Sequence, residues 1–111
     1  MNFDDNRSIY LQICDNICEQ VLSGELKAQD RIPSVREYGA SVGVNPNTVA
    51  RSYEKLTADG VIYNKRGIGF FIADDAPAKV LDREKADFLS REWPAIRRRI
   101  ALLGIDPKEL F

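Results

Sequence analysis

The chain contains no histidine, and this absence bears on both catalysis and metal binding. Histidine is the most common general base near neutral pH and the most common metal ligand in proteins. The sequence also lacks a nucleophile motif and a phosphate-cradling glycine loop of the P-loop type. We therefore expect a protein that is not an enzyme and that needs no cofactor or metal.

Cysteine is scarce as well, with only Cys14 and Cys18, four residues apart. On a helix the two thiols would share a face, but two ligands do not complete a tetrahedral metal site. Buried cysteine often behaves as a small apolar side chain. We interpret both as core residues, although the sequence leaves another role open.

No apolar run is long enough to cross a bilayer, and no signal peptide follows Met1. We therefore expect a cytoplasmic protein with no membrane partner. The length of 111 residues and the hydrophobic content of 44% fit one globular domain with an appendage. Residues 1–7 are polar, and we expect this start of the chain to fray.

The net charge of -1 argues against a uniformly basic nucleic-acid-binding protein, but the charge is unevenly distributed. Acidic residues dominate positions 1–30, whereas positive charge gathers between residues 31 and 72. The basic side chains of that segment are Arg31, Arg36, Arg51, Lys55, Lys65 and Arg66.

The segment from Gly43 to Gly60 has a clear helical pattern. Asn45 suits an N-cap, Pro46 suits the first helical position, and Gly60 suits the left-handed position after the helix end. The opposite face from the apolar stripe bears amides, a hydroxyl and cations, which are the groups that contact base edges and phosphates. The helix alone could equally be an ordinary amphipathic surface helix. Its polar face comprises Asn45, Asn47, Thr48, Arg51 and Lys55.

A shorter helix precedes this segment. Ser34 and Glu37 are spaced as a capping box and predict a helix from there to about Ser41, with Arg36 in its first turn. Gly43 and Val44 leave only a tight turn before the next helix, which makes a helix-turn-helix. A first helix, from about Ser8 to Leu22, would pack behind both.

After Gly60 the helical spacing of apolar residues ends, and residues that favour β-strands follow. Two β-prone triplets, 61–63 and 70–72, flank the tip sequence Asn-Lys-Arg-Gly-Ile-Gly. This pattern predicts a hairpin, and three helices followed by a basic hairpin make a winged helix. We expect Lys65, Arg66 and Gly67 at the tip to contact phosphates or the minor groove rather than serve only as a solubilising turn.

Several spaced motifs resemble the DNA-binding domain of GntR-type bacterial transcription regulators. They are Ile-Pro-Ser-Val-Arg at 32–36, Val-Asn-Pro-Asn-Thr-Val at 44–49, Asp-Gly-Val-Ile at 59–62 and Gly-Ile-Gly-Phe-Phe at 67–71. The Asn-Pro-Asn-Thr-Val version and the short tail resemble the YtrA subfamily. Many relatives carry arginine directly after Thr-Val, where this chain has Ala50 followed by Arg51. The resemblance implies a dimeric DNA-binding regulator. Together with the polar and basic groups described above, it leads us to expect DNA contacts from Ser34, Arg36, Asn45, Asn47, Thr48, Arg51, Lys65, Arg66 and Gly67.

The remaining residues, from Ala76, read as a helical tail that ends at Gly104. Apolar residues recur at spacings of four and three, which is typical of a packed helical seam. Pro94 should kink or split this helix after Trp93. We predict a homodimer through this seam, formed by Leu81, Phe88, Leu89, Trp93, Ile96, Ile100 and Leu103.

Together these patterns predict a mostly α-helical fold with a small β-hairpin. Residues 1–75 would form a winged helix-turn-helix domain and residues 76–111 a helical dimerisation tail. The leading hypothesis is a homodimeric transcription regulator, and more specifically a repressor, that binds a near-palindromic double-stranded DNA operator. The alternative is a winged-helix module that binds another protein. The sequence does not reveal an effector ligand.

Overall fold

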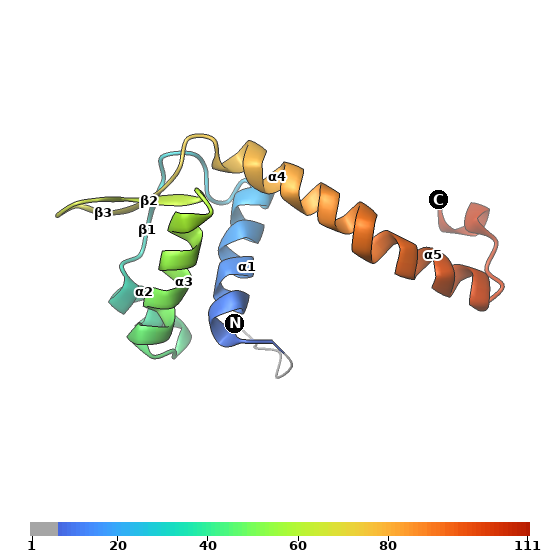
Figure 1. The fold of residues 1–111 in the computed structure, drawn as a ribbon, viewed down its shortest axis with the longest axis horizontal. Helices are drawn as coiled ribbons and strands as arrows, with labels where there is room; N and C mark the ends of the chain where they lie inside the picture. The colour runs from blue at the N-terminus through green and yellow to red at the C-terminus, as the bar shows by residue number, and fades with distance from the viewer. Residues whose placement is uncertain (1–6) are drawn as a thin grey trace. The chain divides into compact units, whose positions relative to one another are not determined.

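The computed structural model describes residues 7–111, so the expected fraying of the start concerns residues outside this range, apart from Arg7. The chain divides into two compact units, Met1–Val80 and Leu81–Phe111. The first unit holds α1 (Ile9–Ser23), β1 (Arg31–Ile32), α2 (Val35–Val42), α3 (Pro46–Ala58), β2 (Ile62–Lys65), β3 (Gly69–Ile72) and the start of α4 (Ala76–Asp87) (Figure 1).

The predicted capping signals are present at the helix ends of the first unit. The Ser34 hydroxyl accepts from the Glu37 amide at 3.1 Å, and the Glu37 carboxylate accepts from the Ser34 amide at 3.0 Å. At α3, the Asn45 side chain accepts from the Asn47 amide at 2.8 Å, and Pro46 occupies the first turn. These caps fix where α2 and α3 begin.

The C-terminal end of α3 also follows the sequence signal. Gly60 has φ +76°, the left-handed value that glycine adopts without strain. Its amide donates to the carbonyl of Thr57 at 3.0 Å, and the amide of Val61 donates to the carbonyl of Leu56 at 2.9 Å. This Schellman pairing satisfies the last carbonyls of α3 and turns the chain directly into the sheet.

The turn between α2 and α3 leaves no room for a side chain at Gly39. A Cβ there would lie 2.6 Å from the carbonyl oxygen of Val44. The amide of Val44 donates to the Gly39 carbonyl at 2.9 Å. This close approach holds the two helices of the helix-turn-helix at a fixed crossing.

The hairpin is confirmed as β2 and β3, but the sheet has three antiparallel strands in the order β1-β3-β2. The sequence analysis did not predict the short strand β1, in which Arg31 pairs with Phe71 and Ile32 pairs with Phe70. Ile32 and Ile72 face inward and are buried, whereas Arg31 lies exposed on the outer face.

One apolar core holds the first unit together. Tyr53 is 1% exposed at its centre, and the first turn of α4 reaches the core through Ala76 and Val80. The domain boundary that we predict after residue 75 falls at the start of this turn. Cys14 and Cys18 are buried thiols in the same core. The other core residues are Ile13, Ile17, Val21, Ile32, Tyr38, Val49, Leu56, Val61, Ile62 and Ile72.

The second unit consists of the rest of α4, a π-helical turn (Phe88–Glu92), α5 (Trp93–Leu102) and a 3-10 helix (Pro107–Leu110). We expected Pro94 to interrupt the helix after Trp93, but the irregular turn lies before Trp93, at Phe88–Glu92. The Trp93 amide donates to the carbonyl of Phe88, five residues back. Pro94 then falls in the first turn of α5, where its missing N–H costs no helical hydrogen bond. In the part of the chain that is described, no helix combines the length and apolarity needed to cross a membrane.

Candidate nucleic-acid interface

The first turn of α2 carries one exposed cation, next to a capping box whose hydrogen bonds are both formed. Arg36 is exposed, while the Ser34 hydroxyl and the Glu37 carboxylate satisfy each other's backbone amides. The two hydrogen bonds from Ser34 lower the pKa of the Glu37 carboxyl, and the charge of Arg31 adds to this effect. Ser34 therefore positions the first turn of α2 through its bonds with Glu37.

Arg31 links α2 to the wing, and the sequence analysis did not assign it to the DNA-contacting set. Its guanidinium lies so close to Gly69 that a Cβ added there would be 3.0 Å from Nε. Its charge also acts on Glu37 in the first turn of α2. The only sequence signal for this placement was a basic residue just before Ile32-Pro33. Arg31 thus lies near both the first turn of α2 and the start of β3.

The wing tip is a tight turn. The amide of Ile68 donates to the carbonyl of Lys65 at 2.9 Å, and Gly67 has φ +78°. Lys65 Nζ lies 4.8 Å from the centroid of the Phe71 ring, on the outer face of the sheet. Arg66 and Gly67 are exposed at the turn itself. The predicted tip residues are therefore all accessible, and Lys65 is held over an aromatic ring.

The first turn of α3 carries the predicted amides. Asn47 is exposed, and Thr48 is half-buried. The Asn45 side-chain oxygen is used by the helix cap, which leaves its NH₂ group to face outward. This turn therefore offers side-chain amides at the point where the backbone N–H groups of a helix also attract anions.

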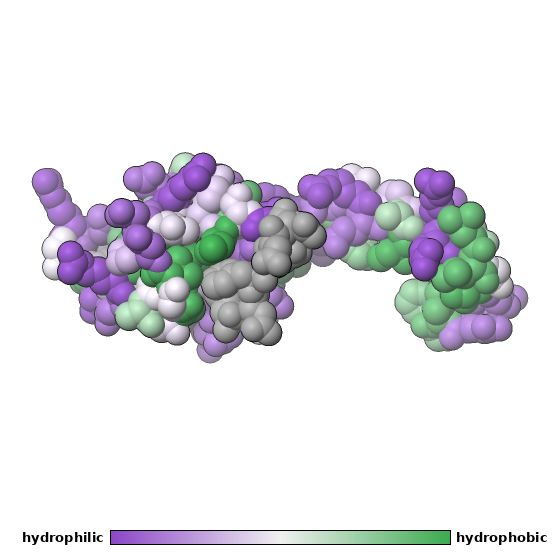
Figure 2. Space-filling view, turned by 90° about the horizontal axis from the view of Figure 1, so that it is seen from below, coloured by the Kyte–Doolittle hydropathy of each residue, from purple (hydrophilic) through white to green (hydrophobic). Residues whose placement is uncertain are grey.

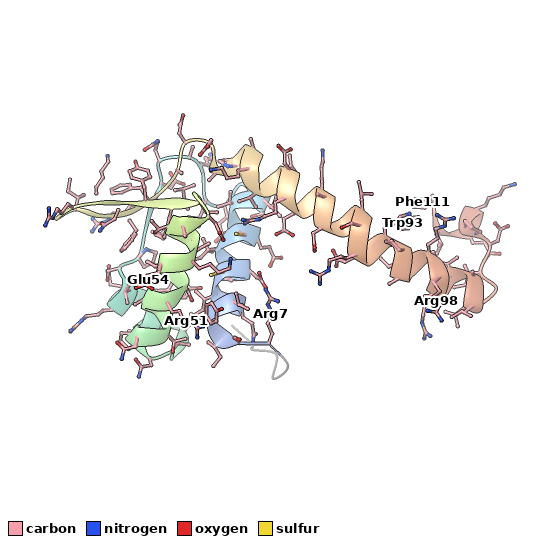
Figure 3. All side chains as sticks on the ribbon, viewed as in Figure 1. Arg7, Arg51, Glu54, Trp93, Arg98 and Phe111 are labelled. Carbon is pink, nitrogen blue, oxygen red and sulfur yellow. The ribbon has the colours of Figure 1, made fainter. Side chains whose placement is uncertain are left out.

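Arg51 points toward α1 rather than straight out from α3. Its guanidinium carbon lies 3.8 Å from the centroid of the Tyr10 ring, a cation–π contact between α3 and α1. Figure 3 shows Arg51 on the side of α3 that faces α1. The stack leaves the N–H edges of the guanidinium accessible. The arrangement therefore favours contact with an anion on the side of α3 that faces α1.

Acidic residues limit the part of α3 that can face an anion. Glu54 is exposed one turn beyond Arg51, and Lys55 is paired with Asp59 at 2.9 Å. The polar face that we predict to continue to Lys55 is therefore charge-balanced in its second half. Only the first two turns of α3 suit a phosphate-lined groove.

A buried tyrosine holds these elements together. The Tyr53 hydroxyl donates to the carbonyl of Pro33 at 2.6 Å, directly before the cap of α2. Its ring meets Phe70 of β3 edge-on, with centroids 5.0 Å apart, and Tyr38 of α2 at 6.2 Å. One side chain of α3 thus contacts both the start of α2 and the wing.

The tail residues that we predict to form a dimer interface are accessible. No residue from Leu81 to Phe111 is buried, and Figure 2 shows apolar side chains gathered on the surface of this unit. Trp93 and Ile100 are half-buried, and the other predicted interface residues are exposed. A shallow apolar groove of about 330 Å³ lies along α5 and is lined by Ala95, Ile96, Arg99, Ile100, Leu103 and Ile105.

No group of three or more His, Cys, Asp or Glu side chains within residues 7–111 is arranged to hold a metal ion. The fold and the accessible polar turns define a winged helix-turn-helix protein of the DNA-binding class. The sequence profile described as "Bacterial regulatory proteins, gntR family" matches residues 9–72. The chain belongs to the GntR family of transcriptional regulators, as its motifs indicated.

Two relatives come from Bacillus subtilis strain 168. The HTH-type transcriptional regulator YhcF is 41% identical over 110 residues, covering 98% of this chain and 88% of YhcF. The HTH-type transcriptional repressor YtrA is 38% identical over 74 residues, covering 67% of this chain and 57% of YtrA. These relatives are regulators rather than enzymes, which confirms the prediction of a non-enzyme and the likeness to YtrA.

Solved structures confirm the fold. A transcriptional regulator from Oenococcus oeni has a TM-score of 0.80 and 32% identity, with 99% of this chain and 90% of that chain covered. A GntR-family regulator from Bacteroides thetaiotaomicron has a TM-score of 0.70 and 48% identity, with 93% and 89% covered. The DNA-binding domain of AraR, solved with operator ORR3, shares the fold at a TM-score of 0.59 and 23% identity, with 66% and 88% covered.

Proposed function

We propose that this chain is a homodimeric, sequence-specific repressor that binds a near-palindromic DNA operator. The observation that carries the proposal is that Arg31 lies near both the first turn of α2, which bears Arg36, and the wing, which bears Lys65 and Arg66. Arg31 touches the wing at Gly69 and acts on Glu37 of α2, so these groups are neighbours. A repressor of this kind would work in the cytoplasm, where the DNA is.

Each predicted DNA-contacting residue has a chemical role in this proposal. Asn47 and the NH₂ group of Asn45 would reach base edges in the major groove, with Thr48 beside them. Arg36 would contact a base or a phosphate, and Arg51 would hold a phosphate from the edge of its stack on Tyr10. Lys65, Arg66 and the Gly67 backbone would hold the wing on the duplex, and Ser34 would lie beside a phosphate at the start of α2.

The tail supports the dimer because it cannot form its own core. No residue from Leu81 to Phe111 is buried within one chain, although this part of the tail includes Phe88 at 41% and Leu89 at 63% exposure. A helical segment of this length is marginal alone and gains its stability by burying an apolar face. A second copy of the chain offers the same apolar face. Pairing of the two faces would set the two copies of α3 about one turn of DNA apart. The proposed seam comprises Leu81, Phe88, Leu89, Trp93, Ile96, Ile100 and Leu103.

The DNA contact is tested by Arg36→Ala, with Lys27→Ala as the control that removes the same charge elsewhere on the first unit. Both residues are exposed. Duplexes selected by the wild-type protein from a random pool serve as targets at fixed salt. We expect Arg36→Ala to weaken binding about 5- to 150-fold, the cost of about 1–3 kcal/mol for a specific arginine contact, and Lys27→Ala to change little. Equal, undiminished binding by both variants would contradict the assignment.

The dimer is tested by sedimentation of Trp93→Asp. Arg98→Asp is the control, because Figure 3 shows Arg98 on the side of α5 away from Trp93. We expect monomers for Trp93→Asp and dimers for the control, since a carboxylate at a buried seam would lose its hydration without a partner. A Trp93→Asp protein that still sediments as a dimer would rule out this seam.

A further inference from the structure

The wing tip carries a large apolar side chain that the core does not use. Ile68 is 58% exposed and lies between Gly67 and Gly69. Its amide donates to the carbonyl of Lys65, and Gly67 takes the positive φ of +78° that a type II turn requires at its third position. The turn therefore presents Ile68 immediately after its bend, within the three-residue loop that joins β2 to β3.

Positive charge surrounds this side chain. Lys65 stands before the turn, Arg66 is exposed within it, and the guanidinium of Arg31 lies against Gly69 just after it. Leu22 on α1 is another exposed aliphatic side chain of the first unit, at 41%. A single aliphatic group flanked by cations along the hairpin is too small for a protein-docking patch. It matches a surface that is negative at its rims and apolar at its walls.

The minor groove of DNA has this character, with phosphates along both edges and deoxyribose along the walls. Architectural proteins insert isoleucine, leucine or phenylalanine there. The floor of the groove differs between base pairs, because only G·C presents the guanine N2 amino group. An aliphatic side chain cannot accept a hydrogen bond from that amino group and would need the space that it occupies.

We propose that Ile68 packs into the minor groove of the operator and makes the protein prefer A·T pairs beneath the wing. This inference rests on the proposed function and deepens it, since it assigns specificity at base pairs outside the major-groove contacts. The flanking cations would hold the tip on the phosphates, and Ile68 would read whether the groove floor is free of the amino group.

Inosine distinguishes recognition of the minor groove by Ile68 from contacts in the major groove. An inosine·C pair has the major-groove edge of G·C but lacks the N2 amino group in the minor groove. Duplexes selected by the wild-type protein from a random pool are resynthesised with G·C or inosine·C replacing each A·T pair in turn. At the pairs under the wing we expect binding to fall about 5-fold or more with G·C and to recover with inosine·C.

The variants then assign the effect to the side chain. Ile68→Ser should lose the discrimination between G·C and inosine·C at those pairs, and Ile68→Val should keep it. Leu22→Ser, an exposed aliphatic on α1, should behave as wild type. Arg66→Ala should weaken binding to all duplexes while the discrimination remains. If Ile68→Ser discriminates as well as wild type, the inference is overturned and the proposed function stands. A wild-type protein that selects no duplex would overturn both.

Discussion

Tyr53→Phe removes one hydroxyl from the centre of the first unit and leaves the ring in place. The hydroxyl donates to the carbonyl of Pro33, and the side chain is 1% exposed. A hydrogen bond of this kind contributes about 0.5–1.5 kcal/mol to the free energy of unfolding. We therefore expect Tyr53→Phe to lower that free energy by about 1 kcal/mol at neutral pH, or by several degrees in melting temperature for a domain of this size.

Urea unfolding followed by circular dichroism measures this loss. Tyr63→Phe is the matched control, because its hydroxyl bonds the side chain of Gln29 at the outer face of the sheet. That bond has access to water on one side, so we expect its removal to cost less than half as much. Equal stability of Tyr53→Phe and wild type would refute the role of the Pro33 contact in holding the start of α2.

The pH dependence of the free energy of unfolding provides a second test of this prediction. Burial raises the pKa of the Tyr53 hydroxyl, and the neighbouring Tyr38 and Glu37 add to the shift. The folded protein therefore keeps this proton above about pH 10, where the unfolded tyrosine loses it. In the wild type, the free energy of unfolding therefore falls as the pH rises past about 10. Tyr53→Phe lacks this hydroxyl and so lacks this part of the decline. The stability gap between the two proteins should narrow above pH 10. A constant gap would contradict the burial argument.

Two further predictions concern the wing and the core. Gly69→Ala should weaken DNA binding and destabilise the hairpin by about 1 kcal/mol, because its backbone has φ +147° and the new Cβ would lie 3.0 Å from Arg31 Nε. In Gly67→Ala, at φ +78°, the new Cβ meets nothing within 4 Å, so the unfolding assay reports a backbone cost alone for comparison. For Cys14, burial and the nearby Cys18 raise the pKa of the thiol to about 11. The unfolded thiol ionises near pH 8.5, so unfolding free energy should fall between about pH 8.5 and 11, and Cys14→Ala should remove that part of the decline; an unchanged slope would count against it.

Local signals in the sequence predicted most of the helix ends. Asn45, Pro46 and Gly60 act through their own backbone neighbours, so their roles follow from the adjacent residues alone. The strand β1 was missed because two residues show no alternation, and its pairing with β3 joins positions far apart in the chain. The break at Pro94 was predicted, but its shift into the π-helical turn depends on how the preceding residues repack their hydrogen bonds.

The candidate site was predictable as a set of residue types but not as a geometry. The sequence indicated that Arg51 belongs to the polar face of α3. It could not show that Tyr10, on a different helix, lies under the guanidinium. Arg31 was likewise visible only as a charge before Ile32, since its contact with Gly69 forms when β1 joins the sheet. Contacts between distant segments decide both side-chain directions, and no local pattern encodes them.

The exposed polar turns and the buried frame beneath them are made of different residues. Asn47 and Arg36 are exposed, whereas Gly39 and Tyr53, which fix the turns, are buried. Exchange of an accessible residue usually costs a protein little stability. A lineage could therefore acquire a new target sequence through a few surface substitutions while keeping its scaffold, and an engineer could diversify the same positions without first restabilising the fold.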